Sequence, residues 1–142
     1  MAPRLRAGFA AGAVGSVFPI VFMIGRRLFG GPPPLFITTY RNVFGGAPLL
    51  EAACIGGVLF VLSGAAWGML FSTFVTDPSS VRGMLFGIAP AFWVFVVVAP
   101  LLLNQPVFFG FAAPKVIPPL LFNCLLWGGF VGWFMRKALP QS

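Results

Sequence analysis

Few side chains in this sequence are suited to acid–base chemistry. The carboxylates are Glu51 and Asp77, histidine is absent, and the cysteines are Cys54 and Cys124. Glu51 and Asp77 bound one apolar run, so a helix through that run would hold them roughly 39 Å apart at about 1.5 Å per residue. A general acid–base pair must reach one substrate, and these two carboxylates therefore do not form one.

The same inventory excludes other familiar reactive sites. Without histidine the chain lacks the base of a Ser-His triad and the imidazole ligand of a haem or pigment. Two cysteines do not complete a tetrahedral zinc site. Cys54 and Cys124 lie inside apolar runs, where a free cysteine behaves as a small hydrophobic residue; a redox role is the alternative. We expect no enzyme activity, no catalytic residue and no metal site, with lipids as the expected bound molecules and any other cofactor left open.

Three polar side chains fall near the middle of apolar runs: Ser16, Ser63 and Asn123. If they face one another across helices, they would form interhelical hydrogen bonds of about 0.6 kcal/mol each. The alternative is a solute or pigment site built on Asn123. An ion-coupled transporter normally places an ionisable group at mid-depth in the membrane, and these runs have none there.

The composition of the chain indicates which secondary-structure elements hold these residues. Of 142 residues, 59% are hydrophobic and 8% are charged, whereas a soluble domain carries about 25% charged residues. Four apolar runs each supply the roughly 20 residues needed to cross about 30 Å of hydrocarbon, and a single segment in lipid satisfies its own backbone as a helix. The sequence predicts an all-α, polytopic integral membrane protein, one transmembrane domain over 1–142. The expected helices are about 7–25, 49–75, 81–103 and 116–135.

The nine cations lie at the borders of the apolar runs, and the net charge is +7. A nucleic-acid-binding chain would gather its cations on one face, so we expect anionic lipid headgroups as partners and no nucleic acid. The ends of the chain and the region of the turn at 76–80, with Arg82 directly after it, carry five Lys or Arg residues, and the loops at 26–48 and 104–115 carry four. The positive-inside rule then favours cytoplasmic termini. The basic start MAPRLR resembles a signal peptide, but no small-residue cleavage site follows, so we expect a retained helix.

Each expected helix contains two glycines four residues apart, which places them on one face. Small residues on one face let helix backbones approach closely in lipid. Ser16 extends the first of these stripes. The pattern predicts a glycine-packed bundle, with dimerisation through one exposed stripe as the alternative. The expected packing residues are Gly8, Gly12, Ser16, Gly64, Gly68, Gly83, Gly87, Gly128 and Gly132.

Other residues predict local features of the helices. Pro19, Pro90 and Pro100 lie inside apolar runs and predict kinks rather than breaks. Ser79 or Ser80 is expected to cap the third helix. Glu51 in the first turn of the second helix is expected to interact with the helix dipole or with Arg41, with a substrate role as the alternative.

The stretch GGPPPLFITTYRNVFGG, residues 30–46, is too apolar for a free aqueous loop. The prolines stiffen its start, and we expect the segment to lie in the membrane interface. If it turns helical after PPP, a spacing of four places Phe36, Tyr40 and Phe44 on one face with Arg41 beside it. These four residues are the expected contact with a protein partner or with lipid.

The pattern RAGFAAGAVGS, then GGVLFVLSGAAWGMLF, then a glycine-rich third helix resembles uncharacterised small four-helix bacterial inner-membrane proteins. The resemblance covers most of the chain and implies location in a bacterial inner (plasma) membrane, but it implies no activity. Family members often carry a polar or histidine position in the last helix, where this chain has Asn123.

Two apolar interfacial loops are expected, at 26–48 and at 104–115. Together with the lack of reactive groups, they indicate an accessory or structural subunit of a larger membrane protein complex, such as a photosynthetic or respiratory one. Other membrane subunits would then be its partners. The alternative is a small homo-oligomeric channel or carrier for an uncharged or lipophilic solute. An enzyme acting on lipid ranks third because acid–base groups are missing.

Overall fold

The computed structural model describes residues 3–140, which form helices joined by short turns, with no β-strand in that range. Four helices are long and apolar enough to cross a membrane, so the prediction of an all-α fold with four such helices is confirmed. Each begins or ends within a few residues of the predicted position. These helices are Pro3–Leu28, Leu49–Phe74, Ser80–Leu102 and Ala113–Ala138.

Three of the four long helices are divided into shorter elements. The first comprises α1 (Pro3–Gly15) and α2 (Val17–Leu28), and the second is the undivided α4 (Leu49–Phe74). The third comprises α5 (Ser80–Phe86), α6 (Ile88–Trp93) and the π-helical η1 (Val94–Leu102). The fourth comprises α7 (Ala113–Leu121), the π-helical η3 (Phe122–Gly128) and α8 (Gly129–Ala138). Between the long helices lie α3 (Leu35–Val43) and the short turn η2 (Val107–Phe111).

A proline accounts for the division between α1 and α2 and for the division between α5 and α6. A proline has no N–H to donate to the carbonyl four residues earlier. For Pro19 that carbonyl belongs to Gly15, where α1 ends, and for Pro90 it belongs to Phe86, where α5 ends. Pro100 lies inside η1. The chain continues as helix beyond each proline, so none of the three breaks its helix, as the sequence predicted.

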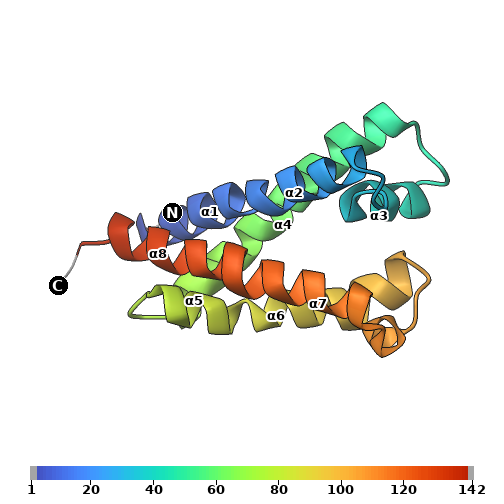
Figure 1. Cartoon of the computed structure of the whole chain (residues 1–142). Coiled ribbons are helices and arrows are strands. Elements are labelled where there is room, and N and C mark those ends of the chain that lie inside the picture. The colour runs from blue at the N-terminus through green and yellow to red at the C-terminus, as the bar shows by residue number, and fades with distance from the viewer. Residues whose placement is uncertain (1–2, 141–142) are drawn as a thin grey trace.

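The helices form two limbs that meet at one end of the molecule (Figure 1). In the first limb α1 packs along α4, and in the second limb α5 packs against α8 and η3. The limbs lie close together at the end that holds the start of α1, the end of α8 and the turn between α4 and α5. They diverge toward the opposite end, which holds α3 and η2. We call these the terminal end and the α3 end.

The glycines of the four predicted pairs lie where helix backbones approach most closely. A Cβ added at Gly12 would overlap the Gly64 carbonyl in the first limb, and a Cβ added at Gly83 would overlap the Gly128 carbonyl in the second. A Cβ on Gly64 would also overlap Ser16 Oγ. All four pairs belong to the halves of the helices nearer the terminal end, which is where the limbs meet.

Two glycine pairs, one before α3 and one after it, end the helices that precede them. Gly30, with φ +82°, and Gly31 end α2 because their N–H groups bind the carbonyls of Arg27 and Arg26. Gly46 closes α3 in the same way by donating to the Arg41 carbonyl at 2.8 Å. This is the Schellman arrangement, which requires a left-handed residue that glycine supplies without strain.

At the terminal end, side-chain hydrogen bonds cap the start of α5 and the end of α4. Ser79 Oγ accepts the Arg82 N–H at 3.2 Å, which confirms the expected cap at the start of α5. Arg4 Nε donates to the Ser72 carbonyl at 2.6 Å, and its Nη2 donates to the Val75 carbonyl. A cation at these last carbonyls favours the end of α4 and ties the first helix to it.

Candidate functional site

A cleft of about 840 Å³ lies between the two limbs, on the side where they diverge. Its walls come from α2 and α4 of the first limb and from α6, η1, α7 and η3 of the second, and α3 lines its outer end. Ser16 and Trp127, both buried, line its deep end. We refer to this space as the cleft.

The three mid-depth polar residues Ser16, Ser63 and Asn123 all line the cleft. The predicted hydrogen bonds between them are not formed. Ser16 Oγ donates to the Gly12 carbonyl at 2.8 Å, and Asn123 Nδ2 donates to the Pro119 carbonyl at 2.7 Å. Both acceptors lie four residues earlier in the same long helix, a local partner that serine and asparagine readily take. The prediction placed these residues in one region of the bundle but assigned them the wrong partners.

Trp127 forms a hydrogen bond between the limbs that sequence reasoning missed. Its Nε1 donates to the Gly12 carbonyl at 3.2 Å, so this oxygen accepts from both Trp127 and Ser16. A buried tryptophan needs an acceptor for its N–H. This requirement was the signal in the sequence that could have indicated such a bond. The acceptor could not be named because it lies 115 residues away in sequence.

The α3 helix lies across the outer end of the cleft. Asn42 Nδ2 donates to the Leu102 carbonyl of η1 at 3.0 Å and so links α3 to the second limb. Tyr40 O–H donates to Glu51 Oε1 at 2.8 Å and links α3 to the start of α4. The predicted interfacial loop 26–48 therefore contains a helix held by both limbs, and Glu51 binds Tyr40 rather than Arg41.

The expected partner surface on α3 must be corrected. Phe36 and Tyr40 are only 6% and 8% exposed because they pack against α4 at Gly56, whose missing side chain leaves room for them. Phe44 is 57% exposed, and Arg41 is exposed as well. The helical spacing was predicted correctly, but two of the three rings face the chain's own helix, so only Phe44 and Arg41 remain accessible to a partner or to lipid.

The hydrogen bond to Glu51 raises the pKa of Tyr40 above its usual value of 10.0. Desolvation of the ring and the negative charge of Glu51 act in the same direction. Each cause disfavours a phenolate beside a carboxylate. Tyr40 is therefore a hydrogen-bond donor to Glu51 throughout the neutral range.

Two cations, Arg26 and Lys115, line the cleft toward the α3 end. Lys115 Nζ donates to Gln105 Oε1 at 3.0 Å, and Gln105 also lines the cleft. No Asp or Glu is among the described residues of the lining. The ion pair between Arg82 and Asp77, at 2.9 Å, lies at the terminal end.

The second limb turns at the α3 end through strained backbone. Phe108, Phe109, Gly110 and Phe111 have φ between 50° and 63°. The left-handed conformation costs roughly 1–2 kcal/mol for a residue with a side chain. Phe109 is buried against Phe95 of η1, and this burial opposes the strain. These residues lie in the loop expected at 104–115, and no signal in the sequence indicated their backbone conformation.

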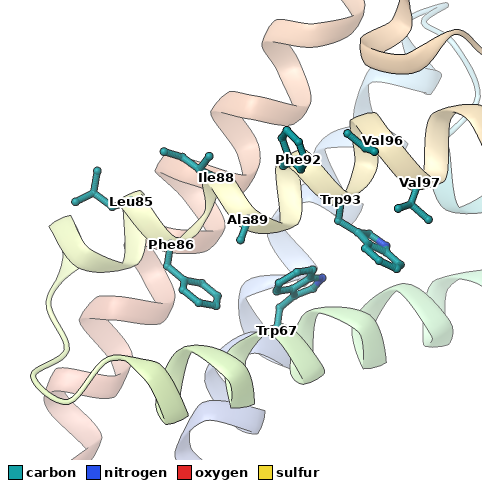
Figure 2. A pocket seen from close by; sticks show the side chains of 9 residues that line it. All are labelled: Trp67, Leu85, Phe86, Ile88, Ala89, Phe92, Trp93, Val96 and Val97. Carbon is teal, nitrogen blue, oxygen red and sulfur yellow. The ribbon is translucent and has the colours of Figure 1, made fainter.

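A second hollow lies on the outside of the molecule, between α4 and the α5–α6 side of the second limb (Figure 2). This outer groove has a volume of about 590 Å³ and is lined by apolar side chains. Trp67 of α4 and Trp93 of α6 line both the outer groove and the cleft. Their ring centroids are 6.5 Å apart in an edge-to-face contact, so the two rings form a wall between the two spaces.

Comparison of the chain with protein-family models, curated proteins and solved structures finds no match. The resemblance to small four-helix bacterial membrane proteins therefore stays a prediction.

Proposed function

We propose that the chain is an integral protein of a bacterial inner (plasma) membrane, that its four long helices span that membrane, and that its glycine pairs hold each limb together. The length and apolar character of the helices support the membrane spans, and the resemblance of the sequence pattern supports the bacterial inner membrane. Large apolar side chains exposed on α4, such as Val58, Leu62 and Leu70, suit a lipid environment. The backbone contacts at the glycines support the last part, since close van der Waals contact drives helix association in lipid.

The orientation that we propose places the termini in the cytoplasm. Its support is the distribution of basic residues, five at the terminal end against four at the α3 end. The cleft would then open toward the non-cytoplasmic half of the bilayer.

For the function itself, we propose that the cleft binds a lipophilic solute and that the protein is a carrier for it rather than an enzyme. The observation that carries this proposal is the size and position of the cleft. At about 840 Å³ it falls within the roughly 300–1,000 Å³ typical of ligand pockets.

The walls of the cleft support the same function. The π-helical segments η1 and η3 both contribute to its lining, from the third and the fourth long helix. Such segments are rare and occur frequently at functional sites. Most of the lining is apolar, with a few polar groups at defined depths, as in pockets that bind small molecules.

The test fills the cleft with a side chain and measures binding of a neutral probe. Trp67, Trp93 and Trp127 line the cleft, so a long-chain alcohol brominated near its end should quench their fluorescence in lipid nanodiscs. Ser63→Phe should reduce this quenching, because position 63 faces the cleft. The matched control is Leu62→Phe, at an exposed neighbour outside the lining. Equal quenching in both variants would mean that the probe reaches the tryptophans from bulk lipid, and the proposal would fail.

The second proposal is an accessory subunit of a larger membrane complex, and the outer groove is the observation that favours it. Its apolar walls between two helices suit the side of a helix from another subunit. Ala89→Phe would fill this groove (Figure 2), and Leu62→Phe again serves as a control on the outer surface. Native gels after mild detergent extraction should show a larger assembly that Ala89→Phe disrupts and Leu62→Phe preserves. Migration of the unaltered chain without any other protein would count against this role.

A further inference from the structure

We infer that the solute of the cleft is a single lipid with a negatively charged headgroup, held with its head at the α3 end and an acyl chain toward Trp127. This rests on the proposed function of the cleft as a binding site. It differs from general attraction of the chain to anionic membranes, because one molecule occupies a defined space between the limbs.

The charge of the lining selects the headgroup. Arg26 comes from the last turn of α2 and Lys115 from the first turn of α7, and both line the cleft. None of the described lining residues is acidic, so nothing within the cleft wall offsets the two positive charges. An arginine guanidinium offers paired N–H donors that match a phosphate group, and a lysine adds a point charge.

The two cations lie at comparable depth. The rings of Phe22 in α2 and Phe122 in η3 are in contact, with centroids 4.4 Å apart. The first and fourth long helices run in opposite directions (Figure 1). Counting from this contact toward the α3 end, Arg26 lies about 6 Å further along α2, and Lys115 lies roughly 10 Å further along the fourth helix. Both charges therefore lie beyond the same aromatic contact, on facing limbs and at the same end of the cleft.

The deep part of the cleft suits an acyl chain. Three polar side chains of this part already have partners within the protein, since Ser16 and Trp127 donate to the Gly12 carbonyl and Asn123 donates to the Pro119 carbonyl. Ser63 adds one hydroxyl group to the lining. A ligand in this part meets mainly carbon atoms. Since charge is concentrated at one end and apolar surface lies at the other, the cleft complements an anionic amphiphile better than a uniformly apolar solute.

The experiment compares two lipids with the same brominated acyl chains, phosphatidylglycerol and phosphatidylcholine, at low concentration in nanodiscs of unlabelled phosphatidylcholine. Quenching of the buried Trp127, in a protein whose Trp67, Trp93 and Trp133 are replaced by phenylalanine, reports occupancy of the cleft. With about 1 kcal/mol for each cation, phosphatidylglycerol should bind about thirtyfold more tightly than phosphatidylcholine. The Arg26→Gln/Lys115→Gln variant should lose this preference. The control Arg136→Gln/Lys137→Gln removes the same charge from exposed positions at the terminal end and should keep it.

The outcomes separate this inference from the proposed function. Equal binding of the two lipids by the unaltered protein overturns the inference, and so does equal loss of preference in both double variants, which would indicate general surface attraction. The neutral brominated alcohol tests the cleft independently of charge. If Arg26→Gln/Lys115→Gln still binds the alcohol, the variant is folded and its loss of preference is specific. If the unaltered protein does not bind the alcohol in the cleft, the proposed function fails as well.

Discussion

Gly12 and Gly25 belong to the same long helix, yet an added methyl group would meet different surroundings at the two positions. At Gly12 it would overlap the backbone of α4, and at Gly25 no atom lies within 4 Å. We therefore expect Gly12→Ala to destabilise the protein by about 1–3 kcal/mol, the usual cost of overpacking. Gly25→Ala should instead stabilise it by about 0.5–1 kcal/mol, because alanine loses less conformational freedom in a helix. Unfolding in mixed micelles, followed by circular dichroism, measures both; a stable Gly12→Ala variant would disprove glycine packing.

Tyr40 provides a second prediction for a single residue, because it is the one tyrosine in the sequence. The bond to Glu51 raises its pKa, so its phenolate absorbance should appear at higher pH in the folded protein than after denaturation. A pKa raised on folding means that the stabilisation is complete below about pH 10, the unfolded value, and is lost as pH rises through the folded value. Glu51→Ala should lower the midpoint of the titration. Identical midpoints in the folded and denatured protein would show that the hydrogen bond is not formed in solution.

Residues with local partners were predictable, and residues with distant partners were not. The Ser79 cap depends on an N–H three residues away, and Pro19 acts on a carbonyl four residues away, so the sequence alone identifies both. The acceptor of Trp127 depends on how the limbs pack. The same reason explains why Phe36 and Tyr40 were assigned to a partner, since the space at Gly56 that receives them exists only in the folded chain.

At the scale of elements, the positions of the long helices follow from composition, whereas the position of α3 depends on tertiary contacts. Composition alone locates the long helices, because each apolar run has the length of a membrane span. The helical spacing of α3 was also predictable, but its position across the cleft depends on contacts with both limbs. The π-helical segments gave no sequence signal beyond Pro100 and the pair Pro118-Pro119.

The contact of α3 with the second limb leads to a prediction about its stability. The Asn42 side chain bonds to the Leu102 carbonyl, and a hydrogen bond of this kind contributes about 0.5–1.5 kcal/mol. Asn42→Ala should therefore raise amide hydrogen exchange in Leu35–Val43 about two- to tenfold if α3 opens as a unit. Arg41→Gln, at an exposed neighbour on the same helix, is the control and should exchange like the unaltered protein. Unchanged exchange in Asn42→Ala would mean that α3 is held by its contacts with α4 alone.

At the scale of the whole molecule, the placement of small and large residues along the helices explains the diverging limbs. All four glycine pairs belong to the terminal end, where the helices approach closely. Toward the α3 end the facing residues include proline and large apolar side chains such as Phe22, Phe122 and Trp93, which keep the backbones apart and leave the cleft. The sequence contained this asymmetry, but assigning the helices to limbs required the structure, because four helices with similar glycine pairs allow several pairings.

The last prediction concerns the orientation of the whole molecule. The termini and the turn between α4 and α5 share one end, and α3 lies at the other (Figure 1). Thr76 and Phe44 are exposed at these two ends, so cysteine can be introduced at each after Cys54 and Cys124 are replaced by alanine. With cytoplasmic termini, a membrane-impermeant maleimide should label Phe44→Cys in intact cells and should label Thr76→Cys only after the membrane is opened. The reverse pattern would place the cleft on the cytoplasmic side and would contradict the proposed orientation. That orientation is based on a difference of one basic residue between the two ends. Labelling of both positions from the same side would contradict a spanning α4, because Phe44 precedes this helix and Thr76 follows it.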